Sequence, residues 1–384
     1  MNSGFELLDY IIFATYAFVI LTIGLWVSRD KKGKEKSAED YFLAGKSLPW
    51  WAIGASLIAA NISAEQVIGM TGSGFVVGLA IASYEWMAAI TLIIVGKYFL
   101  PIFIEKKIYT IPEFVEKRFS TELKTILAVF WIGLYIFVNL ASVLYLGGLA
   151  LETILDVDMK YAVLGLGLFA AAYSLYGGLS AVAWTDIIQV FFLILGGIVT
   201  TYLALDTVSG GQGAIEGFKT IYNAVPEKFD MILDKSNPEY NNLPGLGVLI
   251  GGMWVANIYY WGFNQYIIQR TLAAKSLKES QKGILFAAGL KMIMPLIIVI
   301  PGIAAYVIVN DPQILSSLGD SALANIPGEG ANDKSYPWLM QFLPTGLKGI
   351  AVAALAAAIV SSLASMLNST GTIFTMDIYR QTFN

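Results

Sequence analysis

Two apolar stretches of this chain are interrupted near their middle by side chains that bind polar solutes. The first interruption carries Asn61, Glu65 and Gln66, and the second carries Asn257 and Tyr260. A lipid bilayer offers no water to the backbone, so a spanning helix is interrupted only where it lines a cavity or is buried in protein. Amides and carboxylates bind hydroxyl groups, and aromatic faces cover C–H groups. The pattern predicts a mid-membrane cavity for a polyhydroxylated solute.

Two charged residues, Glu85 and Lys291, lie inside other apolar stretches. A charge at this depth is costly and by default functional, which favours a role in the cavity. Two simpler interpretations stay open, because either side chain could extend to the membrane surface. A functional Lys291 would need an internal partner such as Glu65, or a substrate hydroxyl. Tyr260 could likewise be a packing residue alone.

Adjacent serines, Ser361 and Ser362, lie in the last apolar stretch among many alanines. Small residues let membrane helices pack closely, which is one interpretation of this stretch. The other interpretation is a sodium site, because a hard cation takes hydroxyl oxygens and freed backbone carbonyls as ligands. Asp186 begins another apolar stretch, where it would either complement a helix N-terminus or guide a departing cation.

Composition indicates which elements position these residues. The 384 residues are 57% hydrophobic and 14% charged, with a mean hydropathy of +0.66, whereas soluble domains carry about 25% charged residues. Apolar runs near 20 residues recur, and each can cross a hydrocarbon core of about 30 Å. We predict an all-α polytopic membrane protein with one transporter domain over residues 1–384. Its nine spanning segments lie near residues 8–27, 49–73, 78–104, 123–151, 161–175, 183–205, 246–269, 280–308 and 347–375.

The loops after the first, third and seventh segments are rich in Lys and Arg. Such loops face the cytoplasm, so we expect the N-terminus outside. Residues 8–27 form a leading helix, and residues 49–205 form a first repeat of five helices. Residues 246–375 form part of a second, inverted repeat that also opens with an interrupted helix. We expect the core to be truncated after the third helix of this second repeat.

Five motifs resemble the solute:sodium symporter family, and most closely its sugar-transporting members. They are Glu39–Lys46, Ala59–Gln66, Gly177–Ser180, Trp261–Gln265 and Ala356–Ser362. The resemblance covers essentially the whole chain. It implies a LeuT-like core of five plus five helices in inverted repeats. It also implies sodium-coupled symport of a galactose- or glucose-like monosaccharide into the cell by alternating access.

The resemblance also implies roles for individual residues. The substrate contacts would be Asn61, Gln66, Glu85, Asn257, Tyr260 and Lys291. The gates would be Met70, Tyr84 and Tyr260. The sodium ligands would be Ala59, Ile62, Ala358, Ser361 and Ser362, with Asp186 on the sodium exit path. Ala88 stands where the sugar transporter has a serine.

The chain has no Cys and no His, which removes the usual nucleophile and metal ligands and argues against an enzyme. Sodium is expected as the co-transported ion. The expected partners are a monosaccharide, sodium and the lipid bilayer of a bacterial inner membrane, with no nucleic acid and no obligate protein partner. Alternatives are a symporter of an amino acid or vitamin with the same fold, or a solute sensor built on this scaffold.

Overall fold

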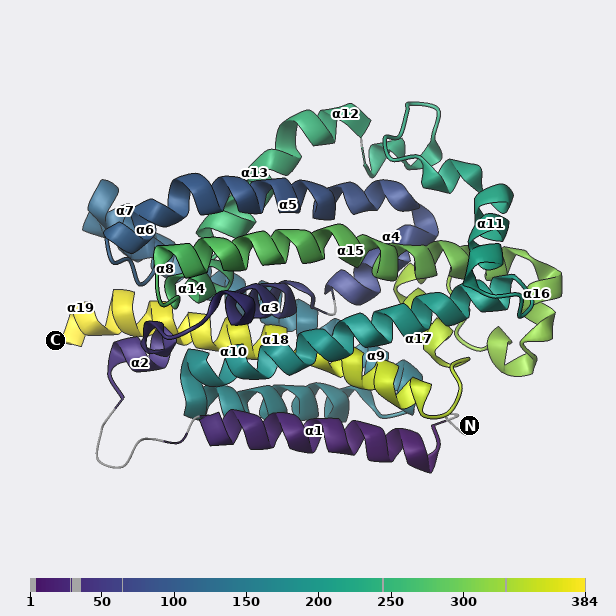
Figure 1. Ribbon diagram of the computed structural model, residues 1–384, viewed down its shortest axis with the longest axis horizontal. Helices are drawn as coiled ribbons and strands as arrows, with labels where there is room; N and C mark the ends of the chain where they lie inside the picture. Colours follow the sequence, from purple (N-terminus) through teal and green to yellow (C-terminus); the bar gives the residue numbers. More distant parts are fainter. Residues whose placement is uncertain are drawn as a thin grey trace.

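The computed structural model describes residues 5–27, 29, 36–63, 65–243, 245–328 and 330–383. Its described part contains helices and no strand (Figure 1). Seven of these helices are long and apolar enough to cross a membrane, and one bent pair forms an eighth span. The predicted fifth segment corresponds to the shorter apolar helix Met159–Ala172. The all-α polytopic prediction is therefore confirmed.

The helices divide into two sets along the chain. The first set is α1 (Leu7–Val27), α2 (Ala38–Phe42), α3 (Trp50–Asn61), α4 (Met70–Val76), α5 (Ser83–Ile94), α6 (Leu100–Glu105), α7 (Ile111–Arg118), α8 (Thr121–Leu134), α9 (Ala141–Leu155) and α10 (Met159–Val208). The second set is α11 (Ala214–Ala224), α12 (Gly245–Gly247), α13 (Met253–Ile258), α14 (Gln265–Leu272), α15 (Leu277–Asn310), α16 (Pro312–Ser317), α17 (Ser335–Met340), α18 (Leu347–Ile373) and α19 (Arg380–Phe383).

Wider, π-helical turns join several of these helices. The turns used below are η2 (Glu65–Gly69) before α4, η5 (Tyr135–Leu140) between α8 and α9, η8 (Val248–Gly252) before α13, and η9 (Tyr259–Phe263) after α13. Such turns are rare and occur frequently at functional sites, which directs attention to the places where they meet.

Both predicted interruptions are present. The α3 helix ends at Asn61, and the chain bends by 62° before it continues through η2 and α4. The amide of Ser63 donates to the carbonyl of Asn61, whereas in a continuous helix it would donate to Ala59. The carbonyl of Ala59 is thereby released from its helical partner. In segment seven, Asn264 leaves helical geometry between η9 and α14 (φ −87°, ψ 120°).

The long helix α15 packs directly against both halves of the broken segment two. Glycines make this approach possible, as is common between membrane helices. A Cβ at Gly54 of α3 would lie 2.7 Å from the carbonyl oxygen of Gly283, and one at Gly302 would lie 2.0 Å from that of Thr71 in α4. Figure 1 shows α15 running between α5 and α10, and its contacts with both helices are extensive.

Proline interrupts the hydrogen-bond ladder of α15 without breaking the helix. Pro301 has no amide proton for the carbonyl of Ile297, four residues before it. The hydroxyl of Thr201 in α10 lies 3.2 Å from that carbonyl and 2.7 Å from the carbonyl of Gly197 in its own helix, so the two carbonyls share one donor. The hydroxyl of Thr71 in α4 lies 2.8 Å from the next carbonyl, Ile298, and 2.6 Å from the carbonyl of Val67 in its own segment, so it too is a shared donor. Side chains of neighbouring helices thus support the carbonyls around Pro301, as a lipid environment requires.

The helix α18 forms the centre of the bundle, and α1 lies at its edge. In the most apolar window of α18 and its continuation, 89% of residues are buried, against 17% for α1. Figure 1 shows α18 crossing the middle of the molecule, while α1 borders it. The α10 helix leaves helical geometry at Gly178 alone, so its two apolar parts follow each other without a long loop.

A lysine of the long loop at 206–245 fastens this loop to the membrane helices. The ammonium of Lys228 donates to the carbonyls of Phe75 and Val76 at the end of α4, at 2.9 Å each. It also lies 3.9 Å from the ring centre of Tyr306 in α15. Burial lowers the pKa of Lys228. The loop also contains the helix α11.

Two glycine substitutions in α15 test the close helix contact. Gly302→Ala places a methyl group against the backbone of α4, and overpacking of this kind costs about 1–3 kcal/mol. Gly289→Ala in the same helix meets no atom within 4 Å, and alanine favours a helix over glycine by about 1 kcal/mol. We expect the thermal unfolding temperature in detergent to fall for Gly302→Ala and to stay the same or rise for Gly289→Ala. Equal shifts for both variants would contradict the contact.

Candidate functional site

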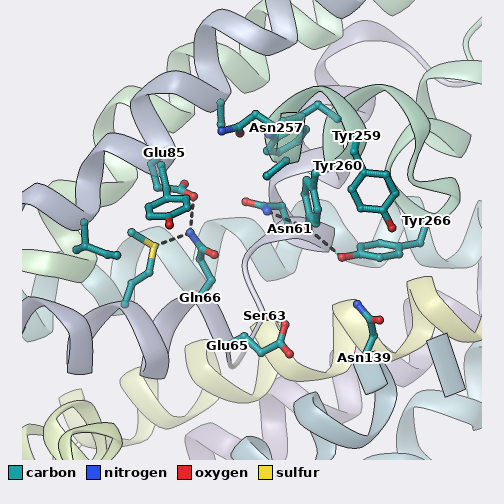
Figure 2. A pocket seen from close by; sticks show the side chains of 16 residues that line it. Asn61, Ser63, Glu65, Gln66, Glu85, Asn139, Asn257, Tyr259, Tyr260 and Tyr266 are labelled. Carbon is teal, nitrogen blue, oxygen red and sulfur yellow. Dashed lines mark hydrogen bonds between the residues drawn. The ribbon is translucent and has the colours of Figure 1, made fainter. Parts of the chain in front are cut away.

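A cavity of about 460 Å³ lies where the two interrupted segments meet. Its volume falls in the range of about 300–1,000 Å³ that small-molecule sites occupy. Figure 2 shows Asn61 and Tyr260 beside each other, with Glu85 and Gln66 on one side and Tyr259 and Tyr266 on the other. The lining residues are Asn61, Ser63, Glu65, Gln66, Met70, Ile81, Tyr84, Glu85, Ala88, Asn139, Ala256, Asn257, Tyr259, Tyr260, Trp261 and Tyr266.

Lys291 and Glu85 form a buried ion pair at this cavity. Lys291 is 0% exposed and Glu85 is 5% exposed. The Lys291 ammonium donates to the carboxylate of Glu85 and to the side-chain oxygen of Asn61. It also lies 5.2 Å from the ring centre of Trp261. Neither charge extends to the membrane surface. The carboxylate that pairs with Lys291 belongs to Glu85 and not to Glu65, the partner that the sequence suggested.

Glu85 is held from a second side by the interrupted helix. The amide of Gln66 donates to Glu85 and to the sulfur of Met70. Of the predicted gate residues, Met70 is buried, whereas Tyr84 is 39% exposed. Both line the cavity. The structure thus brings together the predicted substrate contacts and the residues predicted to gate them.

Tyr260 lies at the middle of a chain of hydroxyl and amide groups. Its hydroxyl accepts from the side-chain nitrogen of Asn61 at 3.0 Å, and from the hydroxyl of Tyr266 at 2.9 Å. Asn61 therefore links Tyr260 to Lys291. Asn257 also lines the cavity and donates to the backbone of Met253 in its own helix, at 3.1 Å.

Sequence reasoning missed several lining residues. Asn139 is the clearest, because it is the single Asn or Gln in the apolar span Thr121–Leu155. A lone amide in such a span was a readable signal for a polar site. Glu65, which the sequence places at the first interruption beside Asn61 and Gln66, lines the cavity as well, although it is not among the predicted substrate contacts. The π-helical turns η2, η5 and η9 each supply lining residues, and all three border this one cavity.

The predicted sodium ligands lie behind the first interruption, and all are buried. The hydroxyl of Ser362 donates to the carbonyl of Ala60 at 3.1 Å, so α18 faces the end of α3 there. The hydroxyl of Ser361 donates to Asp186 at 2.5 Å. A hydroxyl that donates its proton keeps its oxygen lone pairs for a cation. These positions, together with the released carbonyl of Ala59, offer the oxygen donors that sodium prefers.

Asp186 does not cap a helix start. It lies eight residues, about two turns, beyond the break at Gly178. It is fully buried and pairs with Arg270 of α14 at 3.4 Å. Its carboxylate also accepts from Ser56 of α3 and from Ser361 of α18. The capping interpretation is therefore wrong, because Asp186 joins four helices directly next to the predicted sodium ligands.

The comparison with protein families decides the class of this site. The model of the sodium:solute symporter family matches residues 41–384. The chain belongs to this family. It is therefore a membrane transporter and not an enzyme, and sodium is its co-transported ion.

Similar proteins agree in sequence and in fold. A "Sodium/glucose cotransporter" of Vibrio parahaemolyticus is 71% identical over 381 residues, which is 99% of this chain and 70% of that protein. A human "Sodium/myo-inositol cotransporter 2" is 34% identical over 98% of this chain and 57% of its own length. This symporter chain thus spans less than two thirds of the human relative.

A solved structure of a Na⁺-coupled sialic acid symporter, substrate-bound and open to the outside, superimposes with a TM-score of 0.82. It is 25% identical, and the match covers 99% of this chain and 76% of that chain. The likeness confirms the LeuT-like architecture that the motifs implied.

A double-mutant cycle tests the buried pair. Lys291→Met and Glu85→Gln each leave one polar partner unpaired in the interior, and removing one member of a buried pair costs about 3–5 kcal/mol. We expect each single variant to lower the thermal unfolding temperature in detergent, and the double variant to recover most of the loss. A double variant as unstable as the sum of the two singles would contradict the pair.

Proposed function

We propose that the protein containing this symporter chain imports a galactose- or glucose-like monosaccharide with sodium, across a bacterial inner membrane, by alternating access. One observation carries the proposal: Asn61, Glu85 and the ring of Tyr260 line one cavity at the interruption of segment two, and the buried Lys291 binds Asn61 and Glu85 from behind this wall. Amide and carboxylate groups suit paired hydroxyls, and the ring suits the C–H face of a pyranose.

The charge of the cavity favours a neutral, polyhydroxylated solute over an anion. The ammonium of Lys291 is already paired with Glu85, and Glu65 adds a second carboxylate to the wall. An amino acid or organic acid would bring a carboxylate to a wall without an unpaired cation among the described lining residues. The printed names of the relatives, glucose and myo-inositol, also denote polyhydroxylated solutes. An amino acid or vitamin is therefore the second candidate.

The sodium site is proposed at Ala59, Ile62, Ala358, Ser361 and Ser362. Support comes from the released carbonyl at the break and from the neighbouring hydroxyls. We propose further that Asp186 receives sodium on its way out, since Ser361 joins the two. The basic loops support an outer N-terminus and the inverted arrangement of residues 49–205 and 246–375.

Uptake into vesicles tests the proposed function. Reconstituted full-length protein should accumulate labelled galactose with an inward sodium gradient, because solute entry is coupled to sodium entry. Replacing sodium by potassium should abolish accumulation. Competition with glucose, myo-inositol and proline then identifies the class of solute. Displacement by proline but not by any sugar would favour the amino-acid alternative.

Removing one hydroxyl tests the sodium site. Ser362→Ala deletes a predicted ligand, and the loss of one interaction of about 1–2 kcal/mol corresponds to about 5- to 30-fold in affinity. We expect the sodium concentration for half-maximal uptake to rise by this factor. Thr370→Ala is the matched control, since among the residues that the structure describes the Thr370 hydroxyl bonds only Met366 of its own helix. An unchanged sodium dependence of Ser362→Ala would refute the assignment.

A further inference from the structure

The interruption of segment seven is closed by a side chain from another helix. Tyr135, in the turn η5, is fully buried. Its hydroxyl donates to the side-chain oxygen of Asn264 at 2.6 Å, and it accepts from the backbone amide of Gln265 at 3.0 Å. These two residues follow the turn η9 directly, where the chain leaves helical geometry.

A hydroxyl is the group that this position requires. The break removes the intrahelical partner of the Gln265 amide, and an unpaired amide inside a bilayer is costly. A tyrosine hydroxyl donates and accepts at once, so it can bind the amide and Asn264 together. A phenylalanine would fill the same volume and satisfy neither group. The hydroxyl of Tyr135 therefore has a role that packing alone does not explain.

The same side chain reaches toward the predicted sugar-stacking residue. The ring of Tyr135 packs edge-on against the ring of Tyr266, with 5.6 Å between ring centres and 71° between planes. The hydroxyl of Tyr266 donates to that of Tyr260, and these two rings are also edge-on at 6.0 Å. Figure 2 shows Tyr266 next to Tyr260 at the cavity. The hydroxyl of Tyr135 thus holds Asn264 and Gln265 at the break, and its ring packs against Tyr266, which binds Tyr260.

The break is connected to a basic loop as well. The side chain of Gln265 accepts from the amide of Ile111 at 2.9 Å and donates to the carbonyl of Tyr109 at 3.0 Å. Ile111 begins α7, beyond the loop that follows α6. Gln265, whose backbone amide binds Tyr135, is thus also bound through its side chain to the loop on the predicted cytoplasmic side.

We propose that Tyr135 is a positioning residue for sugar binding, which fixes the interruption of segment seven so that Tyr260 presents its ring to the cavity. The inference deepens, and rests on, the proposed sugar symport. Tyr135 itself is absent from the cavity wall among the described lining residues, so its effect on the sugar passes through Asn264, Gln265 and Tyr266.

Matched tyrosine substitutions in the reconstituted full-length protein test this role. Tyr135→Phe should raise the KM for galactose by about 5- to 30-fold, as expected for one lost interaction of this kind. The maximal rate per folded molecule should change by less than about twofold, since the remaining machinery is intact. Tyr145→Phe, in α9 and 55% exposed, is the same chemical change on the lipid side and should leave KM unaltered.

Asn264→Ala provides a second, independent variant. It removes one of the two groups that the Tyr135 hydroxyl binds, so its effect on KM should be less than additive with Tyr135→Phe. A Tyr135→Phe protein with less folded material but unchanged KM would overturn the proposal, because a merely structural role lowers maximal uptake alone. Additive effects of the two substitutions would also overturn it. Absence of sodium-dependent sugar uptake by the unaltered protein would instead refute the proposed function, and this inference with it.

Discussion

The architecture depends on one constraint: backbone groups released inside a bilayer must find partners within the protein. The two predicted interruptions, in segments two and seven, are each stabilised by a side chain of another helix. Ser362 of α18 donates to the carbonyl of Ala60 at the first break, and Tyr135 closes the second. Thr201 shares its hydroxyl proton between its own helix and the carbonyl that Pro301 leaves without an amide partner in α15. Some of the polar residues near the cavity thus stabilise the broken helices, because they bind backbone groups that lipid cannot.

Charge in the interior follows the same logic. Lys291 is bound by Glu85 and Asn61, and Arg270 is bound by Asp186. Each pair joins helices that are distant in sequence, and each lies beside a proposed ligand, the sugar in one case and sodium in the other. Because a buried pair is weak as a source of stability, its presence at both sites is better explained by transport than by folding.

The sequence allowed the spans and both interruptions to be predicted, because hydropathy and polar substitutions within an apolar run are local properties. The partner of Lys291 could not be predicted in the same way. Glu65 and Glu85 are equally polar, and only the packing of α15 against α5 selects Glu85. The role of Asp186 was ambiguous for the same reason: an Asp near the start of an apolar run can either complement a helix N-terminus or join buried helices, and the local sequence does not distinguish the two. Tyr135 gave no signal, as tyrosine is an ordinary residue in an apolar helix.

The close contacts of α15 also separate the rigid part of the site from its adaptable part. Gly283 and Gly302 hold the two halves of segment two on either side of Lys291, so backbone atoms already in contact leave α3, α4 and α15 little freedom to shift. Segment seven is different. Its outer turn η8 has no buried residue and leaves helical geometry at Gly251. The geometry around Lys291 is therefore fixed by packing, whereas the position of Tyr260 depends on hydrogen bonds, which exchange at a much smaller cost than backbone contacts.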